Sequence, residues 1–555
     1  MKKLSLSLIF SLFVFFAYAE GISNYKELLA FAKAVNKEAD ISAWKNSKGV
    51  VCLKADIDMK KGKKFPSIKS FNGVFDGCGH KLYNWSATTP LFERLESSAL
   101  VRNLVIDASC SMSIRSVLNE ANVLVAYIAH INNGSIRNCA NHGVIEFIGE
   151  ETIKSVYIGA IVARNFHIVA DCKNTATVSA SFGHTKHNKG LYLHMGGIVG
   201  SNVGKSTPKC TVGRCENSGN VTYMGDLPSS QIGGIIGESS KGWTKDCVNR
   251  GNIVAVGTPF EAKGISPVAR VAGITAWALN GIVGCDNYGV ISVSGALDAM
   301  ASGICCFMNA SSKITDCINR GKVTTNVTLS SHSAGILSRT SHSVFVSNCY
   351  NYGEISARKS VRANYVGGIV SCIVARKDYK RDMVVSDCAN FGTISNGSTS
   401  KYAATGGVIG FAAGSKKDGK VINVSLQGNL NYGKASGVNP RVGGIFGATN
   451  DCFKVDETLQ YELAKEVKPL ASGENIFGRV VDTEGMPVPD VVVSVGEQSV
   501  KSDVNGEFAL KCDMAKARFV ELTAPAEYAT PEQGYRCRVI RGMAAARTDF
   551  VLKKQ

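Results

Sequence analysis

The stretch from residue 233 to residue 251, GGIIGESSKGWTKDCVNRG, contains the two motifs that decide the fold. It opens with a Gly-Gly-Ile element and closes with Cys247-Val-Asn249, which Gly251 follows. The same two elements return along the chain in the same order. Two linked motifs that recur at a nearly constant distance are typical of a solenoid, in which each repeat forms one coil.

The Cys-x-Asn element occurs eight times, and a degenerate ninth copy has Asn429 and Asn431 in the two places. Successive cysteines are 32 to 43 residues apart, which indicates a constant coil with variable insertions. The eight pairs are Cys139/Asn141, Cys172/Asn174, Cys215/Asn217, Cys247/Asn249, Cys285/Asn287, Cys317/Asn319, Cys349/Asn351 and Cys388/Asn390.

Each repeat carries short β-rich segments broken by Gly and Asn, such as Ile314–Cys317 and Lys322–Thr325, and it has no helical period. The sequence therefore predicts an all-β protein, with a right-handed parallel β-helix from about Gly49 to Thr449. Coils would stack about 4.8 Å apart, so equivalent residues would form ladders. We expect the cysteines to face inward, the asparagines to stack at a turn, and the Gly residues to adopt turn conformations.

The 18 cysteines would usually suggest disulfides in an exported protein. An in-register parallel ladder does not offer the required Cβ separation and torsion, so we expect the eight repeat cysteines to be free and buried. Cys512 and Cys537 lie outside the ladder, and the sequence leaves open whether they pair.

Residues 1–19 have the pattern of a secretory signal peptide. Lys2 and Lys3 precede the apolar run Leu4–Phe16, and Ala17-Tyr18-Ala19 is a small-x-small cleavage site. We therefore expect cleavage after Ala19 and export, with the mature chain secreted, periplasmic or on the cell surface. No later run of about 20 apolar residues predicts a transmembrane helix.

The repeats resemble the GLUG-motif family of bacterial secreted and surface proteins, through the pattern Gly-Gly-Ile-Val-Gly…Cys-x-Asn-x-Gly-x-Val. The resemblance covers about Val123 to Thr449 and implies β-solenoid repeats over residues 123–455. Residues 20–122 are expected to form an N-terminal cap and the first coils. Within them, Tyr25–Asn36 has apolar residues at helical spacing and predicts a capping helix.

Residues 474–555, after a linker at 456–473, have short apolar segments separated by Gly/Pro turns, which predicts a small β-sandwich. The segment resembles carboxypeptidase-regulatory-like, prealbumin-like modules. More narrowly, it is similar to the N-terminal module of calcineurin-like phosphoesterases, through Val493–Gly496, Asp503–Gly506, Phe519-Val520 and Pro525–Tyr528. The sequence has no dimetal His/Asp cluster, so the resemblance implies no phosphatase activity.

The search for catalytic motifs is mostly negative: neither His-Glu-x-x-His nor Gly-x-Ser-x-Gly occurs. Gly204-Lys205-Ser206 imitates a phosphate loop, but Val199 replaces its first Gly. Asp503-x-Asn505-Gly506 is either a calcium-binding fragment or, as we expect, a plain turn. His184, His187 and His194 are either a metal-binding trio or, as we expect, part of a solvated basic loop.

Aspartates precede the ladder cysteines on every second coil, as Asp171, Asp246, Asp316 and Asp387. Carboxylates about 9–10 Å apart are near the upper limit for an inverting glycosidase. We prefer a simpler interpretation, in which alternation avoids repulsion between stacked like charges. The sequence thus predicts no catalytic, cofactor-binding or metal-binding residue.

The formal net charge of +17 is carried by the solenoid, because the C-terminal module is close to neutral. A basic surface favours acidic partners. We expect an exported, non-enzymatic binding or adhesion protein, whose partner is an anionic polysaccharide or a cell-surface protein and not a nucleotide. The alternative is a glycan-processing β-helix enzyme, either a polysaccharide lyase or a glycoside hydrolase, and it rests on fold analogy alone.

Overall fold

The computed structural model describes residues 21–60, 64–115, 122–149, 155–183, 192–204, 211–226, 229–258, 268–309, 312–341, 344–374, 383–413, 424–427, 429–449, 460–461, 474–517, 519–528, 537–539 and 546–555. The predicted signal peptide lies outside these residues, as do His184, His187, the Lys205-Ser206 pair and most of the linker.

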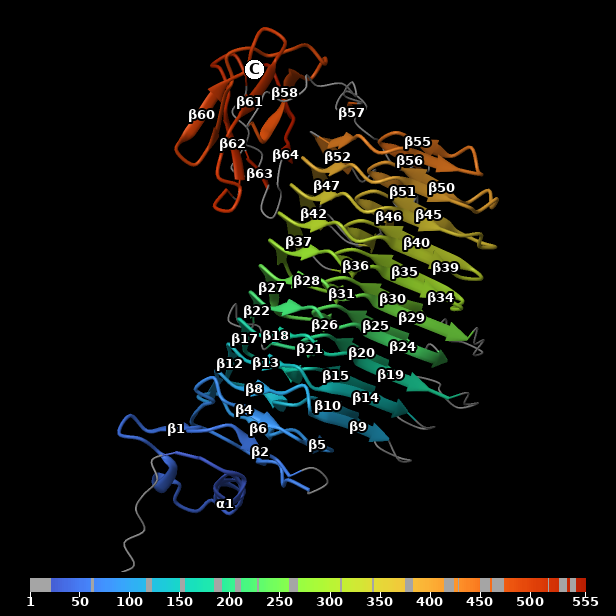
Figure 1. Ribbon diagram of the computed structural model, residues 1–555. Helices are drawn as coiled ribbons and strands as arrows, with labels where there is room; N and C mark the ends of the chain where they lie inside the picture. Colours follow the sequence, from blue (N-terminus) through green and yellow to red (C-terminus); the bar gives the residue numbers. More distant parts are fainter. Residues whose placement is uncertain are drawn as a thin grey trace, which may run out of the picture.

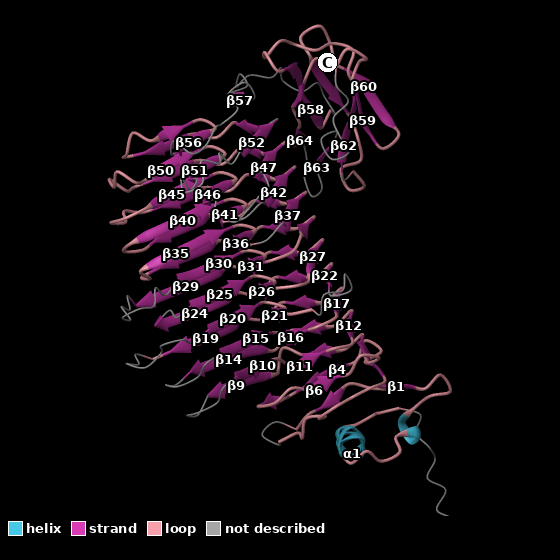
Figure 2. Cartoon of the chain, turned by 180° about the vertical axis from the view of Figure 1, so that it is seen from behind, coloured by secondary structure: helices cyan, strands magenta, loops and turns pink. Residues whose placement is uncertain are grey.

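The repeats form a β-solenoid of five parallel sheets, confirming the all-β fold (Figures 1 and 2). From Leu100 to Thr449 each coil places one strand in each sheet, and the chain passes through sheets I to V in order before it begins the next coil; the coils before Leu100 lack strands in some of the sheets.

The strands of the five sheets have the following bounds. Sheet I contains β1 (Val50–Cys52), β3 (Val74–Asp76), β7 (Leu100–Arg102), β12 (Ser135–Arg137), β17 (Ile168–Ala170), β22 (Thr211–Gly213), β27 (Trp243–Lys245), β32 (Ile282–Val283), β37 (Ser312–Thr315), β42 (Val344–Ser347), β47 (Met383–Ser386) and β52 (Val424–Gln427). Sheet II contains β2 (Ile57–Asp58), β4 (Lys81–Tyr83), β8 (Val105–Ile106), β13 (Ala140–Asn141), β18 (Lys173–Asn174), β23 (Glu216–Asn217), β28 (Val248–Asn249), β33 (Asp286–Asn287), β38 (Ile318–Asn319), β43 (Tyr350–Asn351), β48 (Ala389–Asn390), β53 (Asn429–Asn431) and β57 (Gln460–Tyr461). Sheet III contains β5 (Ser86–Ala87), β9 (Ser111–Arg115), β14 (Val144–Gly149), β19 (Val178–Phe182), β24 (Val221–Asp226), β29 (Ile253–Thr258), β34 (Ile291–Ser294), β39 (Val323–Asn326), β44 (Ile355–Ala357), β49 (Ile394–Asn396) and β54 (Ala435–Gly437). Sheet IV contains β10 (Asn122–Val125), β15 (Ser155–Gly159), β20 (Tyr192–Gly196), β25 (Ser229–Gly233), β30 (Val268–Ala272), β35 (Asp298–Ser302), β40 (Ser330–Ala334), β45 (Asn364–Gly367), β50 (Ala404–Gly406) and β55 (Val442–Gly443). Sheet V contains β6 (Phe92–Leu95), β11 (Ala129–Asn132), β16 (Val162–Asn165), β21 (Val199–Asn202), β26 (Ile236–Ser239), β31 (Thr275–Ala278), β36 (Cys305–Met308), β41 (Leu337–Thr340), β46 (Val370–Val374), β51 (Ile409–Ala413) and β56 (Phe446–Thr449).

Helix α1 (Tyr25–Asn36) closes the N-terminal end of the solenoid, as the sequence predicts. The Asn24 side chain caps it by accepting a hydrogen bond from the Glu27 backbone N–H at 3.1 Å. Phe31 is buried and packs against the rings of Phe71 and Phe75 in the first coils. A 3-10 turn, η1 (Ser42–Trp44), follows. Among the described residues, neither helix has the length and apolar character of a membrane-spanning segment.

The ladder cysteines and asparagines lie in the interior. All eight cysteines are buried, and the cysteines of the described residues are free, Cys512 included. Burial raises the pKa of thiols such as Cys172, Cys285 and Cys349 well above the usual value, so they remain protonated and inert. The side chain of Cys537 lies outside the described part.

The asparagines form one continuous hydrogen-bonded column, here called the asparagine ladder, from Asn141 to Asn431. Each Nδ2 donates to the Oδ1 of the next coil at 2.7–2.9 Å. The same amide also donates to a backbone carbonyl two residues onward, as Asn249 does to Gly251. The amides from Asn141 to Asn390 are therefore satisfied without water, although they are fully buried, and Asn431 at the end of the ladder is half-buried.

Close packing explains the glycines, and it corrects the expectation that turn conformations require them. A Cβ on Gly251 would lie 1.9 Å from the carbonyl oxygen of Gly219 in the preceding coil, and Gly251 has no positive φ. A Cβ on Gly234 would lie 2.5 Å from Cγ of Asn249. The Gly-Gly and Cys-x-Asn motifs recur together because they touch within each coil.

Residues 474–555 form a small β-sandwich, as the sequence predicts. One sheet is mixed, with β58 (Ile476–Asp482) pairing β61 (Glu507–Leu510) antiparallel and β64 (Ala546–Arg547) and β65 (Phe550–Leu552) parallel. The other is antiparallel and contains β59 (Val492–Val495), β60 (Gln498–Lys501), β62 (Phe519–Thr523) and β63 (Cys537–Val539). Strand β60 was not expected from the sequence.

The module lies beside the last coils of the solenoid (Figure 1). Phe519 and Val551 pack against a buried cluster of the solenoid that is formed by Ile318, Tyr350, Ala389 and Leu430. The Tyr432 hydroxyl also donates a hydrogen bond to the Asp549 carboxylate. The Asp503 turn is a plain Asx turn, since its Oδ1 accepts from the Asn505 and Glu507 backbone N–H groups.

Candidate functional site

The aspartates that precede the ladder cysteines lie at bends rather than in strands, which corrects the strand placement assumed from the sequence. Their φ angles are 53–59°, in the left-handed region. The intervening coils place Asn138, Arg214, Gly284 and Asn348 in the same conformation. Asp, Asn and Gly tolerate this region best, so backbone geometry accounts for most residue types at this position.

Neighbouring coils supply partners for two of these aspartates. Arg214 donates to both carboxylate oxygens of Asp171, at 2.6 and 2.9 Å, and thereby holds the pKa of Asp171 below its usual value. The Asn348 amide donates to Asp316 Oδ1 at 2.6 Å. At these two positions a carboxylate on one coil meets a donor on the next coil.

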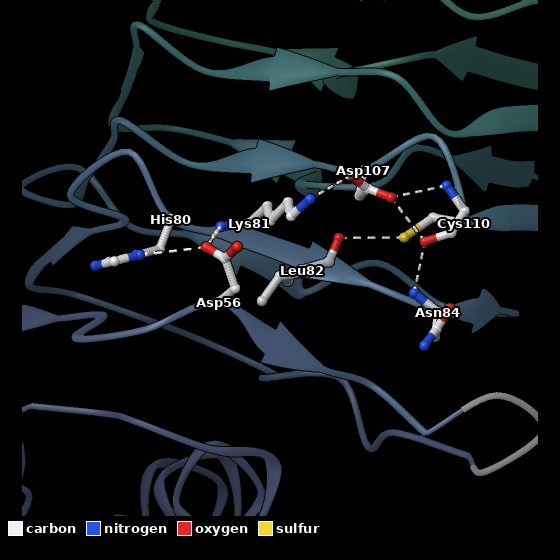
Figure 3. A network of polar contacts seen from close by, with 8 residues as sticks. Asp56, His80, Lys81, Leu82, Asn84, Asp107 and Cys110 are labelled. Atoms are coloured by element: carbon white, nitrogen blue, oxygen red, sulfur yellow. Dashed lines mark hydrogen bonds and ion pairs between the residues drawn. The ribbon is translucent and has the colours of Figure 1, made fainter.

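A similar satisfied network covers the first coils (Figure 3). Asp56 Oδ1 lies 3.2 Å from His80 Nδ1 and accepts the Lys81 backbone N–H at 3.1 Å. The Lys81 ammonium donates to Asp107 Oδ2 at 3.1 Å. Hydrogen bonds from Ser109 and the charge of Lys81 lower the pKa of Asp107 to about 2. This cluster is a set of mutually compensated charges and leaves no group poised for a ligand.

The charges where sheets IV and V meet are arranged differently. In β30, Ala269 and Val271 belong to the core, so Arg270 between them points away from it. Equivalent outward positions on the other strands form two ladders of buried and half-buried side chains, one on each sheet. We call these residues the arginine strip; they are Tyr157, Arg164, His194, Ser201, Gln231, Glu238, Arg270, Trp277, Met300, Phe307, His332, Arg339, Tyr365, Cys372 and Phe411, together with Arg441 directly before β55.

Side chains of the two sheets contact one another along the strip. The Arg164 guanidinium of sheet V lies 4.9 Å from the Tyr157 ring centroid of sheet IV. Further along, the Tyr365 and Phe411 rings stack with centroids 4.4 Å apart. Arg441 lies over the same Phe411 ring at 5.3 Å. The strip is therefore a packed surface on which cations and aromatic faces alternate.

Arginines of the strip have no acidic partner among the described residues. Arg270 contacts the Ser229 hydroxyl at 3.3 Å and the Phe307 ring at 5.7 Å, and its Nε has no hydrogen-bond partner. Nε of Arg339 likewise has none. By contrast, three arginines in or beside strands of sheets I and II form ion pairs at 2.6–3.0 Å; they are Arg102 with Asp76, Arg214 with Asp171 and Arg250 with Glu216.

Burial and mutual repulsion leave the centre of the strip electrostatically unsatisfied. Burial, together with the nearby charge of Arg339, lowers the pKa of the Arg270 guanidinium. His332 is 8% exposed, and its Nδ1 has no hydrogen-bond partner within the described chain. Burial and then Arg339 lower the pKa of His332 to about 3. An anion beside these guanidinium groups would relieve the repulsion between them.

The acidic groups on these sheets lie elsewhere along the strip. Glu238 accepts a hydrogen bond from the Ser201 hydroxyl at 3.2 Å, and its Oε2 lies 3.0 Å from His194 Nδ1. The His194 ring stacks on Tyr157, with centroids 4.7 Å apart. Asp298 lies on β35, and its buried Oδ1 has no hydrogen-bond partner among the described residues.

Of the predicted histidine trio, the described residues contain only His194, which faces Glu238 and not a basic loop. No cluster of metal-ligating side chains occurs in the described ranges. Sequence reasoning missed the rest of the strip. The available signal was the residue two positions before each Gly-Gly-Ile element, where His194, Gln231, Arg270, His332 and Tyr365 all occur.

Comparison with protein families finds a match in the C-terminal module. Residues 474–555 match the family described as N terminal of Calcineurin-like phosphoesterase, which confirms the resemblance of the module. No curated protein matches the chain. A solved structure that it resembles is described as "a putative immunoglobulin A1 protease from Bacteroides ovatus". The identity is 14%, the TM-score is 0.20, and the match covers 77% of this chain and 83% of that one.

Proposed function

We propose that the chain is an exported, non-enzymatic binding or adhesion protein that engages an anionic polysaccharide through the arginine strip. The observation that carries the proposal is the pair Arg270 and Arg339: two half-buried cations near one another without a carboxylate partner. A protein that kept them only for stability would be expected to pair them, as it pairs Arg214 with Asp171.

The chemistry of the strip suits an acidic sugar. A guanidinium presents a planar fork that binds carboxylate or sulfate oxygens through two hydrogen bonds. The aromatic faces of Trp277 and Phe307 offer flat apolar surfaces beside it. Polar groups placed among aromatic side chains are the usual composition of a ligand site.

Sequence features support the proposed cellular location of the protein and the proposed class of protein. The residue 1–19 leader pattern supports export, and the resemblance of the repeats to the GLUG-motif family supports a secreted or surface protein. The basic solenoid would attract an acidic partner over longer distances. A cell-surface protein with an acidic segment is the other partner that this charge would accommodate.

Affinity chromatography tests the proposal directly. We expect retention on a heparin-like matrix, little retention on a neutral polysaccharide, and steep loss with salt because exposed charges are screened within about 10 Å at 0.1 M. The Arg270→Gln/Arg339→Gln variant should elute early. Arg214→Gln/Arg250→Gln removes the same charge from paired arginines and should elute like the wild type. Equal elution of the two variants would refute a role for the strip.

A second candidate, glycan cleavage, is favoured by one contact. His194 and Glu238 form a carboxylate–imidazole pair with Tyr157 stacked on the ring, and such groups can transfer protons. Incubation with acidic polysaccharides, followed by detection of unsaturated sugars and reducing ends, tests this alternative. Turnover lost in His194→Gln would establish an enzyme there, and turnover lost in Asp246→Asn or Asp316→Asn would instead point to the bend aspartates.

A further inference from the structure

The four strip arginines are spread along the solenoid axis rather than gathered in one place. Arg164 lies on β16, Arg270 on β30, Arg339 on β41, and Arg441 directly precedes β55. Following the coils, these positions are three, two and three coils apart. At the usual strand spacing the intervals are about 14, 10 and 14 Å, and the whole strip is about 38 Å long.

Aromatic faces occupy two of the three intervals between the cations. Trp277 and Phe307 lie on consecutive strands of sheet V, between Arg270 and Arg339. Tyr365 and Phe411 stack between Arg339 and Arg441. The interval from Arg164 to Arg270 instead carries polar side chains, among them His194, Gln231 and Glu238. From Arg270 onward, a ligand that follows the strip would therefore meet a cation, an apolar face and another cation in turn.

We infer that the strip binds one linear, extended polysaccharide that runs parallel to the solenoid axis, with acidic groups on only some of its sugars. This inference rests on the proposed function and adds the shape and charge density of the ligand. A small anion would bridge Arg270 and Arg339 but would leave Arg164 and Arg441 unused. Only a polymer contacts all four.

The spacing of the strip arginines also favours a polysaccharide over a nucleic acid as the ligand. A nucleic-acid strand carries one phosphate about every 3.4 Å, which is far denser than the cations here. Glu238 and Asp298 lie on the intervening strands and would repel some of those phosphates. A polysaccharide with acidic groups about 10–14 Å apart, which is two to three coil spacings, would match the cations and could avoid the repulsion by these carboxylates.

The test uses the full chain and size-fractionated hyaluronan oligosaccharides, which carry one carboxylate per disaccharide. Fractions shorter and longer than the ~38 Å strip are compared by titration calorimetry. For the wild type we expect affinity to rise with length until the strip is spanned and then to level off. In Arg164→Gln/Arg441→Gln, binding of the long fraction should fall about tenfold or more, while binding of the short fraction stays unchanged. Arg214→Gln/Arg250→Gln is the charge-matched control, and circular dichroism melting checks that each variant is folded.

Equal affinity of short and long fractions for the wild type would overturn the inference. So would an end variant that weakens both fractions alike, or a single-stranded oligonucleotide that binds more tightly and responds to the same variants. Failure of the proposed function is a different result: no acidic polysaccharide would bind at any length, and heparin-like matrices would not retain the wild type.

Discussion

The asparagine ladder and the arginine strip are both columns of polar side chains that run along the same solenoid, but only one of them is self-sufficient. Each amide of the ladder before the last one, Asn431, donates to the next coil and to a carbonyl of its own coil, as Asn287 does. Along the strip, Arg270 and Arg339 keep donors without partners, and His332 keeps a partnerless ring nitrogen. A satisfied column holds the coils together, whereas an unsatisfied one is available to a ligand.

The same contrast holds between arginines. Arg214 lies at the bend between sheets I and II, Arg250 directly follows a strand of sheet II, and both are paired with carboxylates of the preceding coil. The strip arginines are more buried than these two and yet have no carboxylate partner among the described residues. Position in the coil therefore separates residues that stabilise the fold from those that we propose bind a partner.

The largest expected effect comes from a charge placed inside the solenoid. Cys317 is fully buried in the ladder, and Cys317→Arg would leave an unpaired charge there. We expect a loss of about 4 kcal/mol or more, enough to prevent folding of the central coils. Cys317→Ala is the control and should fold. A melting curve of Cys317→Arg that matches the wild type would contradict an interior cysteine ladder.

Breaking the asparagine ladder should cost less. Asn287→Ala removes the acceptor of Asn249 and the donor to Asn319, which leaves buried amide groups unsatisfied. The expected loss is about 1–3 kcal/mol, seen as a lower melting temperature. Asn220→Ala removes a single exposed contact to the Asn252 backbone N–H and serves as the matched control. Equal melting of the two variants would mean that the ladder is not a stabilising element.

Acid should lower the stability of the folded protein through protonation of His332. Its folded pKa of about 3 is below the ordinary value of about 6.5, so the unfolded chain takes up a proton first. The contribution of this group to stability is present above pH 6.5 and is lost as the pH falls toward 3. Its surroundings, Met300, Arg339 and Tyr365, include no carboxylate that would stabilise a protonated ring.

Melting at pH 7 and pH 4 checks this expectation. His332→Gln should reduce the loss of melting temperature between the two pH values. His130, whose pKa burial lowers to about 4, should continue to contribute in both proteins. The same acid sensitivity in wild type and variant would show that His332 is not the group responsible.

The smallest effect is expected at the paired surface charges. Asp171 and Arg214 have side chains 37% and 59% exposed, so Asp171→Asn should change stability by less than about 1 kcal/mol. Because Arg214 lowers the Asp171 pKa, this small contribution is present near neutral pH and disappears as the aspartate is protonated in acid. Chemical denaturation at pH 7 and pH 3 measures it. A large loss at pH 7 would place this pair among the main supports of the fold.

The architecture could be predicted from the sequence because each coil repeats the same constraints. Cys317 and Asn319 recur as a pair since one fills the interior and the other satisfies the turn, and Gly303 recurs because Asn319 packs against it. The capping helix Tyr25–Asn36 was visible from its apolar spacing. Strand β60 was missed because Gln498–Lys501 is short, mostly exposed and without apolar alternation.

The candidate site could not be predicted in the same way, because it arises where different strands of neighbouring coils meet. His194 and Glu238 are brought together by stacking, and no local motif joins them. Arg270 resembles any exposed arginine until sheet V is seen beside it. The bend aspartates were conspicuous because they repeat, yet the contacts of Asp171 and Asp316 indicate a structural role.

The most direct test of the account compares stability and ligand binding in two charge-matched variants. We predict that Arg270→Gln/Arg339→Gln melts at or above the wild-type temperature, since removing two mutually repelling buried charges relieves strain between them, and that it loses heparin-like binding. Arg214→Gln/Arg250→Gln should melt slightly lower and keep that binding. The opposite outcome, in which the strip variant is destabilised but binds normally, would contradict the claim that unsatisfied arginines mark the binding surface.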